Sequence, residues 1–207
     1  MMQSDGDPRP AGGDAVPVHA VGAEELDSVL QTLDECERRF ALAQGFNAEA
    51  GRHVAVPDLE GGIARILFGL GQPDAAERGP LLFGKLATAL PPGDYRLTGT
   101  LADPELAALA FALGGYRFER YRKPKDRAAR LVLPDGADAA SIERIREGVF
   151  LARDLINTPA NDLSPHDLAA AARALADRFG ASIAVVDGEA LQRGFPMIHA
   201  VGAGSDR

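Results

Sequence analysis

Histidine and cysteine are the side chains best suited to bind a metal or to act as acid, base or nucleophile, and this chain has few of them. They are His19, His53, His166, His199 and the single cysteine, Cys36. No two histidines have the short spacing that places two ligands on one helix face, and no cysteine cluster supports them. We therefore predict no metal ligand, no cofactor-binding residue and no catalytic residue in this chain.

Two glycine-rich turns are the next candidates, because backbone N–H groups at such turns can cradle a phosphate. They are Gly69-Leu-Gly71 and the turn at 202–205 (Gly-Ala-Gly-Ser), and each follows a predicted strand. Neither completes the glycine spacing of a dinucleotide-binding turn or the Gly-Lys-Ser/Thr of a P-loop. We interpret both as tight turns.

A basic segment at 116–130 (YRFERYRKPKDRAAR) is the strongest alternative lead. Its cations are Arg117, Arg120, Arg122, Lys123, Lys125, Arg127 and Arg130, and they are interleaved with Tyr116, Phe118 and Tyr121. Basic residues beside stacking aromatics are typical of single-stranded nucleic-acid binding. The alternation of YRFERY suits a strand with aromatic residues inward and basic residues outward, and we interpret the segment as a solvated strand and loop.

The stretch 151–165 (LARDLINTPANDLSP) reads as a hinge between two helices. The first helix must end before Pro159, whose ring lacks an N–H and restricts the preceding residue. Ser164 is a good N-cap for the second helix, Pro165 suits its first position, and Asp167 stands close to a capping box.

The sequence gives little support for a serine nucleophile or for a pair of carboxylates that act as acid and base. No serine lies in a Gly-x-Ser-x-Gly elbow. Asp154 and Asp162 flank the hinge, but a carboxylate pair does acid–base work only in a suitable pocket. We interpret Asp154, with Arg153, as stabilising the hinge.

The apolar pattern indicates the elements that would position these residues. Strands are predicted at 17–21, 53–57, 63–70, 95–98, 131–133, 182–186 and 197–201. Helices are predicted at 23–40, 80–90, 103–113, from 138 or 141 to 157, 165–179 and 187–192. This places His19, His53 and His199 in strands and His166, solvated, on a first helical turn. Cys36 falls on the apolar stripe of 23–40 and is predicted to be buried.

Alternating strands and helices predict an α/β fold: a small N-terminal α/β domain with a mixed sheet, a connecting helix, and the start of a second α/β domain. The predicted boundaries are a disordered lead-in at 1–15, the N-terminal domain at 16–135, the connecting helix at 136–157 and the second domain at 158–207. Six residues follow the last predicted strand, so we expect a piece of a longer protein.

Composition excludes several classes of function. The 207 residues contain no apolar run long enough to span a membrane, and the N-terminus is neither a signal nor a transit peptide. The net charge of −8 disfavours broad binding to nucleic acid or anionic lipid, although a local basic patch could still act. One cysteine fits a reducing compartment, and the expected one is the cytoplasm.

Three strings make the chain resemble the leucyl aminopeptidase (cytosol aminopeptidase) family. RDLINTPANDLSP and GFPMIHAVGAGS resemble the start of its catalytic domain, and FALGGYRFERYRK resembles the N-terminal domain of a bacterial branch. The resemblance implies a metallo-aminopeptidase, a homohexamer, that uses two divalent metals (Mn or Zn) to activate water against peptide substrates. The family's metal-binding motifs fall beyond Arg207, so this fragment alone is expected to be inactive.

A second function stays open beside that resemblance. The chain could be a non-enzymatic binding or assembly module that uses the basic 116–130 segment to contact nucleic acid or an acidic partner. The acidity of the whole chain makes nucleic acid the less expected of the two.

Overall fold

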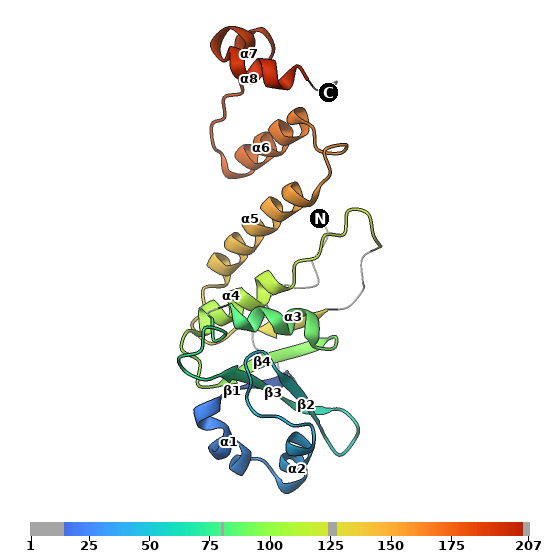
Figure 1. Ribbon diagram of the computed structural model, residues 1–207, viewed down its shortest axis with the longest axis vertical. Coiled ribbons are helices and arrows are strands. Elements are labelled where there is room, and N and C mark those ends of the chain that lie inside the picture. Colours follow the sequence, from blue (N-terminus) through green and yellow to red (C-terminus); the bar gives the residue numbers. More distant parts are fainter. Residues whose placement is uncertain (1–14, 80, 124–127, 205–207) are drawn as a thin grey trace. The chain divides into compact units, whose positions relative to one another are not determined.

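The computed structural model in Figure 1 describes residues 15–79, 81–123 and 128–204. The chain divides into two compact units, Met1–Phe150 and Leu151–Arg207. The division falls inside helix α5 (Ala139–Asn157), which therefore contributes residues to both units.

The first unit is built on a mixed five-stranded sheet, which confirms the α/β prediction. In chain order its strands are β1 (Val16–Gly22), β2 (His53–Pro57), β3 (Ile63–Gly71), β4 (Gly93–Gly99) and β5 (Ala129–Val132). Their order in the sheet is β2-β3-β1-β4-β5. Strand β2 pairs antiparallel with β3, and the remaining neighbours pair in parallel.

Helices pack on both faces of this sheet (Figure 1). One face meets α1 (Leu26–Thr32) and α2 (Glu35–Ala43) through a core that contains Val21, Leu30, Ala41, Val56 and Leu67. The other face meets α3 (Leu86–Ala89), α4 (Pro104–Gly114) and the first part of α5 through Val18, Phe68, Leu86, Phe111 and Ile142. A 3₁₀ turn at Leu82–Lys85 precedes α3 in place of the single helix predicted at 80–90, and Pro80 lies outside the described residues.

The single helix predicted at 23–40 was wrong. A 3₁₀ turn at Ala23–Glu25 leads into α1, Leu33 is extended, and Asp34 caps the start of α2. Because α2 starts anew there, it turns Glu37 and Ala41 toward the sheet. Cys36 therefore lies outside the buried stripe and is exposed, contrary to the prediction of burial.

The second unit contains helices α6 (Pro165–Phe179), α7 (Gly188–Gly194) and α8 (Pro196–Gly202) after the end of α5. The strands predicted at 182–186 and 197–201 were wrong. Residues 182–186 have no strand partner among the described residues, and a strand needs a neighbour for its backbone hydrogen bonds. Residues 197–201 belong to α8, where Pro196 takes the first helical position.

Helix ends follow the local signals closely. Asp103 caps α4 with Pro104 at its first turn, Ser164 and Asp167 form a full capping box on α6, and Gly180 ends α6 with a φ of 62°. The start predicted for the helix at 165–179, with Ser164, Pro165 and Asp167, is confirmed. Within the described ranges, no helix combines the length and the apolar character that crossing a membrane requires.

Candidate functional site

The four histidines lie on four different elements. His19 is on β1, His53 on β2, His166 is exposed on the first turn of α6, and His199 is on α8, not in the predicted strand. Over 15–79, 81–123 and 128–204, no three His, Cys, Asp or Glu side chains gather in a way that could hold a metal. The described residues thus do not fit the two metals that the family resemblance implies.

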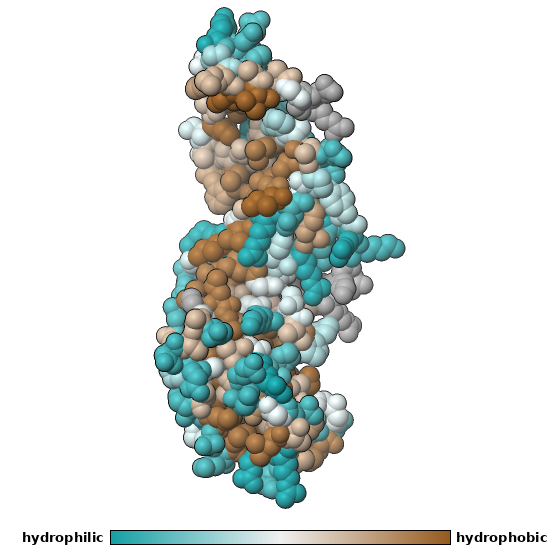
Figure 2. Space-filling model, viewed as in Figure 1, coloured by the Kyte–Doolittle hydropathy of each residue, from teal (hydrophilic) through white to brown (hydrophobic). Residues whose placement is uncertain are grey.

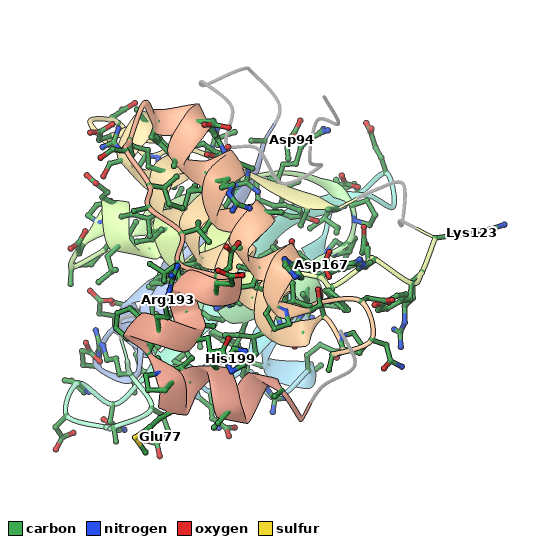
Figure 3. The ribbon with its side chains drawn as sticks, turned by 90° about the horizontal axis from the view of Figure 1, so that it is seen from above. Glu77, Asp94, Lys123, Asp167, Arg193 and His199 are labelled. Atoms are coloured by element: carbon green, nitrogen blue, oxygen red, sulfur yellow. The ribbon has the colours of Figure 1, made fainter. Side chains whose placement is uncertain are left out.

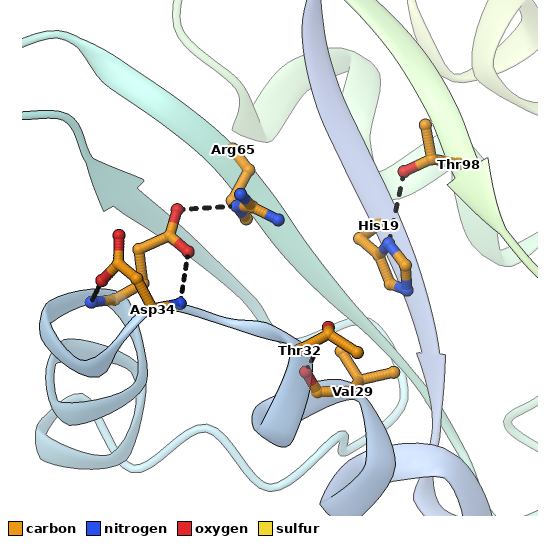
Figure 4. Close-up of polar contacts among 7 residues, drawn as sticks. His19, Val29, Thr32, Asp34, Arg65 and Thr98 are labelled. Carbon is orange, nitrogen blue, oxygen red and sulfur yellow. Dashed lines mark hydrogen bonds and ion pairs between the residues drawn. The ribbon is translucent and has the colours of Figure 1, made fainter.

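His19 has the most distinctive environment of the four (Figure 4). Its Nδ1 lies 3.5 Å from Oγ1 of Thr98 on the neighbouring strand β4. Burial lowers the pKa of the imidazole below its ordinary value of 6.5, and the positive charge of Arg65 lowers it further, while Glu25 opposes both. A half-buried histidine that is hydrogen-bonded across two strands is a packing residue, and its position in a strand is the one predicted.

The glycine turn at 69–71 uses its N–H groups inside the fold. Gly69 N donates to Arg52 O at 2.8 Å, and Gly71 N donates to Ala48 O at 2.8 Å. Of the turn predicted at 202–205, Gly204 N, at the end of α8, donates to Val201 O at 3.3 Å, and Ser205 lies outside the described residues. Since these donors already have backbone acceptors, the tight-turn interpretation is favoured over a phosphate cradle.

The predicted hinge has an ordered hydrogen-bond pattern. Thr158 is buried and closes the end of α5, because its N and Oγ1 donate to Asp154 O at 3.0 and 2.6 Å. Asp162 N and Leu163 N then donate to Pro159 O at 2.8 and 3.0 Å. Asp154 acts here through its backbone carbonyl, at the position where the sequence predicted a stabilising residue.

The basic segment does not form the predicted strand. Residues 116–119 have no regular secondary structure, a turn follows in which Arg122 N donates to Glu119 O at 3.0 Å, and 124–127 lie outside the described residues. Its cations differ in environment: Arg130 pairs with Asp94 at 2.7 Å, whereas Arg117, Arg120, Arg122 and Lys123 are exposed. Residues 116–123 therefore form a basic loop, and Ala129 and Arg130 belong to β5.

An aromatic contact that the sequence did not predict holds the start of this loop. The Tyr116 ring stands edge-on to Phe150 of α5, with centroids 5.1 Å apart. Arg146 stacks on Phe150 at 5.1 Å and is itself buried, held by Glu143 through an Nε–Oε2 contact of 2.7 Å. Spacing along α5 could suggest the Glu143–Arg146–Phe150 group, but nothing local points to Tyr116.

Apolar side chains are exposed over much of the second unit, as the brown surface over α6 to α8 in Figure 2 shows. Ala176 and Thr158 are its buried residues among those described. The exposed large apolar residues are Ile156, Leu168, Leu175, Phe179, Ile183, Val185, Val186, Phe195, Met197, Ile198 and Val201. Ile156, Met197 and Val201 are 81%, 83% and 83% exposed, which is far above what a self-contained core leaves in solvent.

Comparison with known proteins identifies the class to which this arrangement belongs. Residues 16–134 match the model of the M17 aminopeptidase N-terminal domain, and residues 150–207 match that of the cytosol aminopeptidase family catalytic domain. The two matches follow one another along the chain, so the class of protein that this fold defines is that of the M17 aminopeptidases. The chain belongs to the cytosol aminopeptidase (M17) family, which confirms the resemblance seen in the sequence.

Individual relatives agree with this assignment. The probable cytosol aminopeptidase of Streptomyces avermitilis is 37% identical over 77% of this chain and 30% of its own length. That of Corynebacterium glutamicum is 30% identical over 92% of this chain and 41% of its own length. The crystal structure of the cytosol aminopeptidase from Coxiella burnetii superposes with a TM-score of 0.83 at 33% identity, over 95% of this chain and 43% of that one. The chain spans less than half the length of these relatives.

Proposed function

We propose that this chain is the N-terminal portion of a leucyl aminopeptidase-like enzyme that removes N-terminal amino acids from peptides by metal-assisted hydrolysis. The observation that carries the proposal is the order of the two matches: an M17 N-terminal domain is followed by residues that match the catalytic domain. The described residues hold no metal-ligand cluster, so no step of the hydrolysis is assigned to them.

The domain boundaries along the chain are part of this proposal. Residues 16–135 form an N-terminal assembly or regulatory domain after a lead-in at 1–15. Residues 136–157 form the connecting helix, and residues 158–207 begin the catalytic domain. The exposed apolar side chains of the second unit support its being part of a larger catalytic core, because such surface is normally covered.

The finer properties of the whole enzyme follow the family and are proposals too. They are a peptide substrate, two divalent metals (manganese or zinc), assembly as a homohexamer and a location in the cytoplasm. A solved relative that is 28% identical over 86% of this chain, with a TM-score of 0.67, is a bottromycin maturation enzyme in complex with Mn. That relative supports manganese as the first metal to test.

A direct test uses the purified 207-residue chain with a leucyl anilide substrate and added Mn²⁺ or Zn²⁺. We expect no hydrolysis above that of metal and buffer alone, while the Coxiella burnetii cytosol aminopeptidase, assayed in parallel, serves as a positive control. Metal-dependent hydrolysis by this chain would contradict the proposed inactivity. Sequencing downstream of the Arg207 codon supplies the other half of the test, because an in-frame stop codon there would favour the binding-module alternative.

A further inference from the structure

The described helices of the first unit leave part of one sheet face uncovered. On the side of α1 and α2, the buried core contains residues of β1, β2 and β3, and among the described residues none of β4 or β5. Arg96 of β4 is exposed on this side, because its neighbours Tyr95 and Leu97 pack in the core on the opposite side. Strands that pair in parallel are normally covered on both faces. The open half-face, formed by the start of β1 with β4 and β5, is therefore a surface where a ligand can bind.

Two arginines lie in one row across this open half-face. Pro17 of β1 pairs with Arg96 of β4. On the other side of β1, Val18 pairs with Ile66, so Arg65 of β3 lies beside Pro17. Two strand spacings separate the Cα atoms of Arg65 and Arg96 by about 10 Å, and only the small ring of the proline lies between them. Both guanidinium groups can therefore reach one small ligand above Pro17.

Both arginines keep hydrogen-bond donors available for such a ligand. The Nε of Arg65 lies 2.8 Å from Oε1 of Glu37, which holds the guanidinium on the side of α2. The terminal nitrogens of Arg65 and the whole guanidinium of Arg96 have no hydrogen bond or ion pair with any described residue. The carboxylate of Asp94, on the next row of β4, is already paired with Arg130 at 2.7 Å (Figure 3). It therefore does not neutralise Arg96.

His19 and Thr98 border the arginine row on the side of the carboxyl ends of the strands (Figure 4). The Nδ1 of His19 lies 3.5 Å from Oγ1 of Thr98. Burial, and then the positive charge of Arg65, lower the pKa of the His19 imidazole, and the negative charge of Glu25 opposes them only in part. The charges nearest to the row therefore favour an anion over a cation.

We propose that Arg65 and Arg96 form a binding site for a phosphate group, either free or as a monoester of a small metabolite, a function beyond peptide hydrolysis. A phosphate monoester has three acceptor oxygens, enough for both guanidinium groups, whereas a carboxylate has only two. The planar guanidinium also matches the geometry of phosphate better than an ammonium group does. Such a ligand makes the first unit a regulatory domain that responds to a phosphorylated small molecule.

The test adds inorganic phosphate or methyl phosphate to the full 207-residue chain at about pH 7.5, where a phosphate monoester is mostly a dianion. NMR spectra of the imidazole C–H groups follow all four histidines together. The signals of His19, assigned with a His19→Gln variant, should move in a saturable way, while those of His53, His166 and His199 stay in place. Sodium chloride of equal ionic strength should move none of them. The ligand that binds more tightly shows whether free phosphate or a monoester is preferred.

Two variants test the arginines themselves. Arg96→Ala should weaken phosphate binding about ten-fold, because it removes hydrogen bonds to a charged group. Arg65→Lys keeps the positive charge beside Glu37 but loses the planar fork, so it should also weaken binding. Far-UV circular dichroism confirms that each variant is folded.

Arg144→Ala is the matched control. Arg144 on α5 is also an exposed arginine of the first unit, and it has no ion pair or hydrogen bond through its side chain with any described residue. This variant should bind phosphate like the parent chain, and equal weakening in it would overturn the proposal. The proposal would also be overturned if the His19 signals moved no more than those of the other histidines, or if Arg96→Ala bound phosphate as tightly as the parent chain.

Discussion

The Nε of Arg65 on β3 lies 2.8 Å from Oε1 of Glu37 on α2, and this ion pair ties the helix to the sheet (Figure 4). Oε2 of the same carboxylate accepts from Asp34 N at 3.2 Å and completes the capping box of α2. One buried carboxylate therefore joins the start of a helix to a central strand. Asp34 and Glu37 have the spacing of a capping box, although the single helix predicted at 23–40 ran through both, and no local pattern indicates the contact with Arg65.

Changing Glu37→Ala should lower the free energy of unfolding of the first unit by about 2–3 kcal/mol. The substitution removes a charged hydrogen bond and half of a capping box, although Arg65, with 35% of its side chain exposed, can partly return to solvent. Urea unfolding followed by tyrosine fluorescence checks this, since Tyr95, Tyr116 and Tyr121 all lie in the first unit.

Glu35→Ala is the matched control for that experiment. Glu35 pairs with Arg38 and Arg39 on the outer side of α2, and its side chain is 54% exposed. Exposed pairs of this kind contribute about 0.5 kcal/mol or less. If Glu35→Ala lowered the free energy of unfolding as much as Glu37→Ala does, the buried pair of Glu37 with Arg65 would contribute no more than an exposed pair.

Gly114→Ala should destabilise the first unit by about 2 kcal/mol. A Cβ at this position on α4 would stand 2.0 Å from the backbone oxygen of Gly84, so the helix and the 3₁₀ turn at Leu82–Lys85 would have to separate. Gly148→Ala on α5 meets nothing within 4 Å and should instead stabilise by about 0.8 kcal/mol through helix propensity. Shifts of the same sign in both variants would contradict this, again measured by urea unfolding.

Ser164→Ala should loosen the first turn of α6 by about 1 kcal/mol. Ser164 Oγ accepts from Asp167 N at 3.3 Å, and Asp167 Oδ2 accepts from Ser164 N at 2.8 Å. Faster hydrogen exchange of the Asp167 and Leu168 amides, which donate to Ser164, is the expected readout. Ser182→Ala, at an exposed position outside any helix, should leave those rates unchanged.

His19 should make the first unit less stable as the pH falls below about 6.5. The pKa of His19 is lowered in the fold, mainly by burial. As the pH falls, the unfolded chain therefore binds a proton before the folded chain does, and this protonation stabilises the unfolded state. The stability that the neutral His19 contributes is fully present above the pKa of the unfolded chain, and it is lost as the pH falls toward the lower pKa of the folded chain. Unfolding measured across that window should have a smaller pH slope in His19→Gln, and an unchanged slope would refute the assignment.

Short-range chemistry determined much of the local structure from the sequence alone. Ser164 with Pro165 marks a helix start because the serine side chain accepts a first-turn N–H and the proline ring needs no N–H partner. The strand at His53–Pro57 was predicted with its observed bounds. The strings RDLINTPANDLSP and GFPMIHAVGAGS were sufficient to suggest the family.

Tertiary structure decided what depends on partners distant in the chain. The order β2-β3-β1-β4-β5, the contact between Glu37 and Arg65 and the packing of Tyr116 on Phe150 join residues far apart in sequence. The apolar run at 182–186 has the composition of a strand, yet it is unpaired in the described structure, because backbone hydrogen bonds need a neighbouring strand. An apolar residue type indicates that a side chain is stabilised by burial, but only the neighbouring elements of the folded chain decide whether that side chain is buried.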